Sequence, residues 1–434
     1  MLKRSLLAAG VSLATVTSAY AEPVSLQYWM WDPPQKAAYQ QCADAFTVKN
    51  PDITINISQF GWNDYWTGIT TAFVSGNAPD VFVNNVSRFP EFLDNGQLTD
   101  LTPLIERDSV PTDIFRTGLV ALWSGQDGHL YGMPKDWDTI AIIYNADAAE
   151  KAGITAEEMN NLTWNPQDGG TFQQVIARLT LDSQGRNGLD PAFDKNNIAR
   201  YGYVNNRYEG IGQVGWSTLA YANGFKHLGT PWGSDWNYDD PKLAETLEWF
   251  RKITLDKIGI PASELGDLGS IALVSAEKGA LSFAGDWQIN SYLQGAKFKL
   301  GYAPLPVGPL GRRSNLNGIA DAIWTGTKHP EEAWKWVKFL GSEECQLLIG
   351  KTGVVFPAIP AATELSVAKH KEQGVDVTPW LDVATPDQTF LYPVTFHGSE
   401  VLSIINPALD RIFLGTEEIG PILKEANDQI KALY

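Results

Sequence analysis

The sequence VSLQYWM at residues 24–30 is an apolar stretch, and two similar stretches follow it, ITINI at 53–57 and DVFVN at 80–84. The isoleucines of 53–57 alternate with polar residues, which is typical of a strand. The intervening segments, 33–49 and 63–74, predict helices, because two prolines open the first and Ser-Gly-Asn follows the second. This strand–helix–strand–helix–strand order predicts a parallel sheet covered by helices on both faces.

The same alternation returns over the rest of the chain. Apolar runs predict strands at 139–144, 201–204, 280–283 and 318–324, and helical spacing predicts helices at 171–180, 241–252, 330–340 and 419–433. The proline- and glycine-rich segment 303–311 predicts a surface connection. A chain of 434 residues exceeds what one hydrophobic core usually supports. The expected fold class is therefore α/β, with two lobes.

Residues 1–21 have the pattern of a removable secretory leader. Lys3 and Arg4 make a basic start, an apolar run covers 6–16, and Ala19-Tyr20-Ala21 fits the cleavage rule. The apolar run is shorter than the roughly 20 residues that a membrane-spanning helix needs. No cysteine stands directly after the expected cleavage site, where Glu22 follows Ala21, and no later stretch is apolar for long enough to span a bilayer. We therefore expect release into the periplasm, with neither a lipid anchor nor a membrane-embedded part.

Charge and motif content exclude several classes of function. The net charge is −17 and no basic block occurs, so we expect no binding to nucleic acid or to anionic lipid. None of the five histidines is paired at metal-ligand spacing, and P-loop and G-x-S-x-G motifs are absent. The sequence therefore predicts no metal, no cofactor and no catalytic residue. Cys42 and Cys345 can pair in an oxidising compartment, but spacing alone leaves that open.

Side chains at the expected strand ends suggest a ligand site. In open parallel α/β sheets, ligands bind beyond the carboxyl ends of the strands. Aromatic rings there can lie against the C–H faces of a polyhydroxylated ligand, while carboxylates and amides bind its hydroxyls. Packing remains an alternative for each tryptophan, as does helix capping for each Asp or Asn. The strand-end residues are Trp31, Asp32, Phe60, Gly61, Trp62, Asn84, Asn85, Asn205, Asn206, Tyr208, Gly285, Asp286 and Trp287.

Four motifs resemble those of a known family. SGNAPDV at 75–81 resembles S-G-x-x-P-D-V, and YGMP at 131–134, followed by IYN at 143–145, is similar to a segment that crosses between lobes. GAL and GDW within 279–287 resemble G-x-A-A-M…G-x-W, although Leu281 and Ser282 depart from it. PLPVGP at 304–309 and the helix after it are similar to the P-L-P-x-G-P loop. In this order, the motifs resemble the extracellular solute-binding proteins of family 1, the maltose-binding-like receptors of carbohydrate ABC importers.

The resemblance implies a type II periplasmic binding protein with two doubly wound α/β lobes joined by a hinge. The amino-terminal lobe would comprise 22–134 and 308–357, and the carboxy-terminal lobe 135–307 and 358–434. Both cysteines would then lie in the amino-terminal lobe, which is compatible with a disulfide. The matching ligand-binding positions are Trp31, Asp32, Trp62, Asn84, Trp137, Asp138, Asn206, Tyr208, Asp286, Trp287, Asn317, Gly318 and Phe356.

The function that the resemblance implies is capture of a sugar by hinge closure, without catalysis. The expected partners of this monomer are a mono- or oligosaccharide, or a sugar derivative, and the permease subunits of an ABC transporter. An anionic sugar derivative, a glycerol-phosphate ester and a polyamine are alternative ligands. A secreted glycoside hydrolase, with carboxylates about 5–10 Å apart, and an interaction protein without a small ligand are other classes. Candidate anchors for an anion are Arg88, Lys135, Arg207, Arg312 and Arg313.

Overall fold

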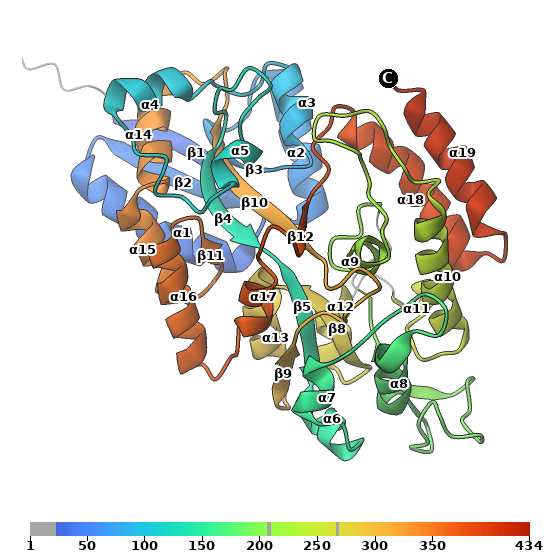
Figure 1. The fold of residues 1–434 in the computed structure, drawn as a ribbon. Coiled ribbons are helices and arrows are strands. Elements are labelled where there is room, and N and C mark those ends of the chain that lie inside the picture. Colours follow the sequence, from blue (N-terminus) through green and yellow to red (C-terminus); the bar gives the residue numbers. More distant parts are fainter. Residues whose placement is uncertain (1–22, 206–209, 266–268) are drawn as a thin grey trace, which may run out of the picture.

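The computed structural model describes residues 23–205, 210–265 and 269–434, and arranges them as two β-sheets flanked by helices (Figure 1). The expected leader, 1–21, lies outside the described residues. The α/β class is confirmed. Among the described residues, no helix is long and apolar enough to cross a bilayer.

The first sheet contains the three strands on which the sequence prediction depended. Strands β1 (Val24–Met30) and β2 (Ile53–Gln59) are parallel, and β1 is also parallel to β3 (Val81–Asn85). Helices α1 (Pro33–Lys49) and α2 (Trp62–Ser75) connect them, as predicted. Gly76 ends α2 with a φ of 68°, a left-handed conformation that glycine adopts without a Cβ penalty.

Four further strands complete this sheet. Strand β10 (Ser314–Ile323) is antiparallel to β3 on one side and to β4 (Met133–Asp138) on the other. The two-residue β11 (Phe356–Pro357) lies beside β4, and β12 (Thr389–Leu391) pairs with β10. The sequence pattern did not predict β4, because its residues MPKDWD are largely polar although all six are buried.

The second sheet has the order β6-β7-β8-β5-β9. Strand β5 (Ile140–Asn145) is antiparallel to β8 (Gly279–Gly285) and to β9 (Leu300–Ala303), and β7 (Ile198–Tyr203) is parallel to β8. The short β6 (Leu181–Asp182) pairs with β7. Only Thr139 separates β4 in the first sheet from β5 in the second. The chain therefore passes from one sheet to the other at Asp138–Ile140, which we call the crossover (Figure 1).

Helices cover both sheets (Figure 1). The segment 304–313 between β9 and β10 contains neither a helix nor a named strand, in agreement with the predicted connection at 303–311. The remaining helices are α3 Phe89–Asp94, α4 Thr102–Asp108, α5 Leu119–Leu122, α6 Ala146–Lys151, α7 Ala156–Asn160, α8 Gly170–Leu179, α9 Trp216–Ala222, α10 Pro241–Leu255, α11 Ala262–Leu265, α12 Gly269–Ser275, η1 Asp286–Gln288, α13 Ile289–Gly295, α14 Pro330–Leu340, α15 Glu343–Gly350, α16 Pro360–Glu372, α17 Thr378–Asp382, α18 Gly398–Leu414 and α19 Ile419–Lys431.

A disulfide joins two helices of the first sheet's layer. Cys42 of α1 and Cys345 of α15 are bonded across 303 residues of sequence, and both side chains are fully buried. The sequence left open whether Cys42 and Cys345 pair, and the structure shows that they do. The bond ties the amino-terminal helix to the segment that follows α14, beside the buried Phe46 and Leu340.

Candidate functional site

Three polar residues meet where the two sheets join. Asp138 ends β4 and pairs in register with Asn317 of β10. Asp286 comes directly after β8, whose last residue, Gly285, pairs in register with Ile140 of β5. Because only Thr139 separates Asp138 from Ile140, the ends of β4, β8 and β10 come together at the crossover.

The carboxylates of this group differ in their hydrogen bonds. One oxygen of Asp138 accepts from Nε2 of Gln213 at 3.0 Å, and the other accepts from Nδ2 of Asn317 at 3.3 Å. Asp286 is only 2% exposed, yet no side chain donates a hydrogen bond to either of its carboxylate oxygens, and Oδ1 of Asn317 is also unpaired. A buried polar atom without a partner costs about 1–3 kcal/mol. Such atoms are uncommon in folded proteins, and pairing with a bound molecule is one explanation for them.

Two buried asparagines at strand ends are also incompletely paired. Oδ1 of Asn84, in β3, accepts from the backbone N–H of Asn85 at 2.9 Å, whereas its Nδ2 is unpaired. Both side-chain polar atoms of Asn205, just after β7, are unpaired. The predicted contacts Asn206 and Tyr208, which follow Asn205, lie outside the described residues. Unpaired amides therefore occur at strand ends of both sheets, as strand-end binding requires.

The crossover region is strongly acidic. Burial raises the pKa of Asp138 and Asp286 well above the ordinary range, and the charge of Asp138 raises the pKa of Asp286 further. The buried Asp136 adds to both shifts. Burial also raises the pKa of Asp32 to about 6, against the opposing effects of a hydrogen bond from Gln35 and of the Lys135 charge.

Lys135 is the buried cation of this region, and its ammonium group is already engaged. Its Nζ lies 3.2 Å from a carboxylate oxygen of Asp136, donates to Oε1 of Gln35 and sits 3.7 Å from the centre of the Tyr39 ring. Its side chain is 0% exposed. Among the described residues, no group of three or more His, Cys, Asp or Glu side chains is arranged to hold a metal ion.

The buried carboxylate of Asp321 gives a prediction about stability. Asp321, in β10, accepts from the hydroxyl of Tyr28 at 2.6 Å, and burial raises its pKa to about 7. Between about pH 4 and pH 7, the folded protein therefore keeps a proton on this carboxylate, whereas the unfolded chain has lost it. The free energy of unfolding consequently falls as the pH rises through that range. Asp321→Asn is expected to raise the free energy of unfolding by about 1–3 kcal/mol at pH 8, and by less at pH 5.

Urea unfolding at the two pH values tests this prediction for Asp321. The exposed Asp52, with Asp52→Asn, is the matched control and should change little at either pH. Equal effects of Asp321→Asn at pH 5 and pH 8 would show that the carboxylate does not titrate in this way.

Aromatic side chains gather after β1 and at the start of α2. Trp31 lies 5.2 Å from Trp62, 5.1 Å from Tyr65 and 5.3 Å from Trp66, measured between ring centres. Trp62 also contacts Trp66 at 5.3 Å. We call these four residues the aromatic cluster. Trp62 is 45% exposed, so its indole offers apolar surface to a ligand while the other rings fix its orientation. Trp287, beside Asp286, is half-buried.

Three of the predicted site residues lie in tightly packed surroundings. Trp137 is 1% exposed, with the guanidinium of Arg116 4.1 Å above its ring and Phe356 5.2 Å away. Phe356 pairs in register with Trp137 and is fully buried. A Cβ on Gly318 would lie 3.0 Å from a methyl group of Leu122, so this glycine permits close packing. The structure therefore brings together Asp138, Asp286 and Asn317 but surrounds Trp137, Gly318 and Phe356 with other side chains.

Sequence reasoning missed two residues of the crossover region, Gln213 and Asp136. Asp136 and Asp138 are two residues apart in β4 and therefore point to the same face of the strand. The polar run KDWD at 135–138 would have indicated Asp136, had it been interpreted as a strand. Gln213 lies in an irregular segment before α9, and no sequence signal marks it.

The sequence left open whether Asp32 caps a helix or binds a ligand. It occupies the N-cap position of α1, where a carboxylate usually accepts a backbone N–H. Its side chain makes no such capping bond, and its Oδ2 is buried and unpaired. Capping therefore does not explain Asp32, and the predicted role in ligand binding stays a prediction.

A second contact joins the two halves of the molecule away from the crossover. The guanidinium of Arg88 donates to the hydroxyl of Ser399, which in turn donates to Glu91. The ring of Trp232 lies 5.7 Å from Phe89 and 5.4 Å from Phe396. This contact connects α3, whose apolar residues pack in the first sheet's core, to α18, whose apolar residues pack in the second sheet's core (Figure 1).

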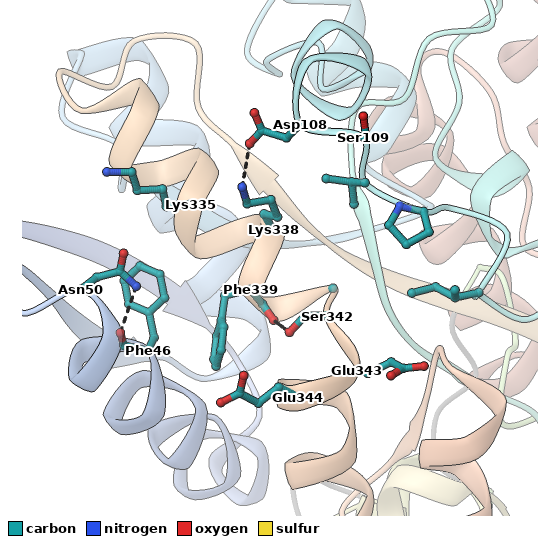
Figure 2. Close-up of a pocket in the computed structure, with 14 residues that line it drawn as sticks. Phe46, Asn50, Asp108, Ser109, Lys335, Lys338, Phe339, Ser342, Glu343 and Glu344 are labelled. Carbon is teal, nitrogen blue, oxygen red and sulfur yellow. Dashed lines mark hydrogen bonds and ion pairs between the residues drawn. The ribbon is translucent and has the colours of Figure 1, made fainter.

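A surface pocket of about 860 Å³ lies elsewhere, among α1, α14, α15 and the residues after α4 (Figure 2). Phe46 and Phe339 form its apolar part, and an ion pair between Lys338 and Asp108, 2.6 Å apart, borders it. None of the predicted ligand-binding residues lines this pocket. Its position therefore gives no support to the predicted site.

The chain is similar to known proteins in sequence and in fold. Residues 31–346 match the sequence profile described as bacterial extracellular solute-binding protein. The arabinooligosaccharide-binding protein of Bacillus subtilis is 25% identical over 79% of this chain and 75% of its own. The lactose-binding protein of Rhizobium radiobacter is 30% identical, but the match covers only 38% of this chain and 39% of that protein.

A solved structure supports the fold assignment. The ABC substrate-binding protein from Listeria monocytogenes in complex with cycloalternan superimposes with a TM-score of 0.79, at 20% identity, over 94% of this chain and 98% of that one. This likeness confirms the expected type II periplasmic-binding-protein fold. Because the family profile covers most of the sequence, the chain belongs to the bacterial extracellular solute-binding protein family.

Proposed function

We propose that this protein is the sugar-capturing component of an ABC transporter and that its ligand binds at the crossover. The observation that carries the proposal is the group of buried, unpaired polar atoms of Asp286 and Asn317. Sugar hydroxyls would supply the missing hydrogen-bond donors, and the exposed indole of Trp62 would supply an apolar contact. Relatives named as lactose-binding and arabinooligosaccharide-binding proteins support the same ligand class.

We propose that capture is a hinge closure between two lobes. Residues 22–134 and 308–357 would form one lobe, and residues 135–307 and 358–434 the other, with the crossover as part of the hinge. A ligand that touches both lobes favours the closed state by its differential affinity for the two states. The closed form would then be recognised by permease subunits. A location in the periplasm fits the leader pattern of residues 1–21, and we propose that the protein acts there as a monomer.

The proposed contacts divide between the lobes. Trp31, Trp62, Asp32 and Asn84 would act from the amino-terminal lobe, and Asp286 and Trp287 from the carboxy-terminal lobe. Asp138 and Asn317 would act at the crossover. Trp137, Gly318 and Phe356 would serve as packing behind the site, since neighbouring side chains already surround them. Asn206 and Tyr208 stay predictions from the sequence.

Binding without catalysis is proposed because the named relatives are binding proteins. The neighbouring carboxylates of Asp138 and Asp286 nevertheless make hydrolysis of a glycoside the rival activity to test. Isothermal titration with mono-, di- and oligosaccharides, followed by chromatography of the recovered ligand, separates the two. One equivalent of unchanged sugar is the expected result. Release of shorter sugars would show hydrolysis, and no heat with any sugar would contradict sugar binding.

The contact between α3 and α18 provides a test of closure. Arg88→Ala removes the donor to Ser399, and it is expected to weaken sugar affinity about 3–10-fold, mainly through faster dissociation, because rim contacts of this kind contribute about 1 kcal/mol. Surface plasmon resonance measures the two rates. Arg107→Ala is the matched control, since Arg107 pairs with Asp108 and Glu331 and does not contact α18. Unchanged dissociation in Arg88→Ala would count against a closing contact here.

A further inference from the structure

We propose that Asp138 and Asp286 together bind a positively charged amino group, so that the preferred ligand is an amine-bearing sugar. This inference rests on the proposed sugar-binding function and names the ligand class within it. It follows from the balance of charges and hydrogen-bond donors around the crossover.

Acidic side chains dominate this region, and because burial raises the pKa of Asp138 and Asp286, a ligand cation would be needed to favour their charged forms. The carboxylates of Asp136, Asp138 and Asp286 are all buried and act on one another electrostatically. The buried ammonium of Lys135 is committed to Asp136, Gln35 and the ring of Tyr39. A buried charge is costly unless it is paired. A ligand cation would pair with the carboxylate of Asp286, to which no side chain of the protein donates a hydrogen bond.

The hydrogen-bond inventory points to the same group. Asp138 receives two side-chain amide donors, from Gln213 and Asn317, whereas both oxygens of Asp286 and Oδ1 of Asn317 receive no side-chain donor. An ammonium group carries three N–H donors and no acceptor, which matches three unpaired acceptors in number. A sugar hydroxyl offers one donor and no charge. A hydrogen bond with one ionised partner is about twice as strong as a neutral one, and an ammonium group adds the pairing of its own charge with the carboxylates.

An anionic ligand fits this region poorly. Arg88 is bound to Ser399 and Glu91, and Lys135 is bound to Asp136. Arg312 donates to the backbone oxygens of Leu305 and Asn160, and Arg313 donates to that of Arg312. Arg207, the fifth candidate anchor, lies outside the described residues. A carboxylate or phosphate at the crossover would therefore face Asp138 and Asp286 with these four cations engaged elsewhere.

Isothermal titration with matched sugars tests the inference. Each matched set contains an amino sugar, its N-acetyl form and the corresponding sugar with a hydroxyl group in place of the amine. The sets are the glucose, galactose and mannose series and the β-1,4-linked dimers of glucosamine, N-acetylglucosamine and glucose. In at least one set, the amino sugar is expected to bind about 10-fold more tightly than both neutral forms. Asp286→Asn is expected to abolish this preference, so that the ratio of amino-sugar affinity to neutral-sugar affinity falls to about one, even where the neutral sugars themselves bind more weakly. Asp138→Asn is a second variant with the same expectation, and Asp52→Asn is the exposed control.

Each outcome decides a separate claim. If neutral sugars bind and no amino sugar binds more tightly than its counterparts, the inference is wrong and the proposed function stands. If the preference survives in both Asp286→Asn and Asp138→Asn, these carboxylates are not the amine site. If no member of any set binds, the proposed sugar-binding function is contradicted, and the inference with it.

Discussion

Replacement of Trp62 by alanine is expected to weaken sugar binding about 30-fold, because a half-exposed tryptophan that contacts a ligand often contributes about 2 kcal/mol. The indole is 45% exposed and is held by Trp31 and Trp66, so it presents apolar surface at little entropic cost. The free energy of unfolding should fall by only about 1 kcal/mol, since the side chain is not buried. Isothermal titration and urea unfolding measure the two effects.

Two further variants make this test specific. Trp62→Phe keeps an aromatic ring and should recover part of the affinity. Val74→Ala changes another exposed apolar side chain on the same helix, α2, where Val74 is 87% exposed, and should leave binding unchanged. Unaltered affinity in Trp62→Ala would remove the aromatic cluster from the site.

Loss of the Cys42–Cys345 disulfide is expected to lower the free energy of unfolding by about 2–5 kcal/mol. The bond closes a loop across 303 residues of sequence, and a long closed loop restricts the unfolded chain strongly. Both sulfur atoms are buried, so Cys42→Ala with Cys345→Ala also leaves small cavities. The thermal midpoint should fall by roughly 2–6 °C.

Thermal unfolding with and without a reductant measures this effect. The wild-type protein should unfold at a lower temperature after the disulfide has been reduced under denaturing conditions and the chain refolded with the reductant present. The double alanine variant is the control, because the reductant should not change its midpoint. Equal midpoints for the oxidised, reduced and double-variant proteins would show that the bond contributes no stability.

Periodicity predicted the parts of the fold in which local pattern and burial agree. The segment 24–85 alternates apolar strands with helices that have clear starts and ends, and its parallel pairing is the predicted one. Strand β4 escaped prediction because its polar residues are satisfied by partners from elsewhere in the chain, such as Gln35 for Lys135 and Asn317 for Asp138. Such long-range pairs leave no local signal.

The missing prediction of β4 also explains why the structure brings only some of the predicted site residues together. Asp286 comes after a strand that the sequence predicted, so the strand-end rule found it. Trp137 lies between Asp136 and Asp138, and in a strand its side chain points to the opposite face. The family resemblance places Trp137 and Asp138 together, and without a prediction of β4 the pattern of the sequence does not separate the two faces of the strand. Gln213 depends on tertiary packing alone.

A crystal structure of the protein with the tightest-binding sugar tests the central claim most directly. We expect the sugar to lie at the crossover, within hydrogen-bonding distance of Asp286 and Asn317, with one face against Trp62. A sugar bound in the pocket beside Phe46 and Phe339, with Asp286 still unpaired, would contradict it.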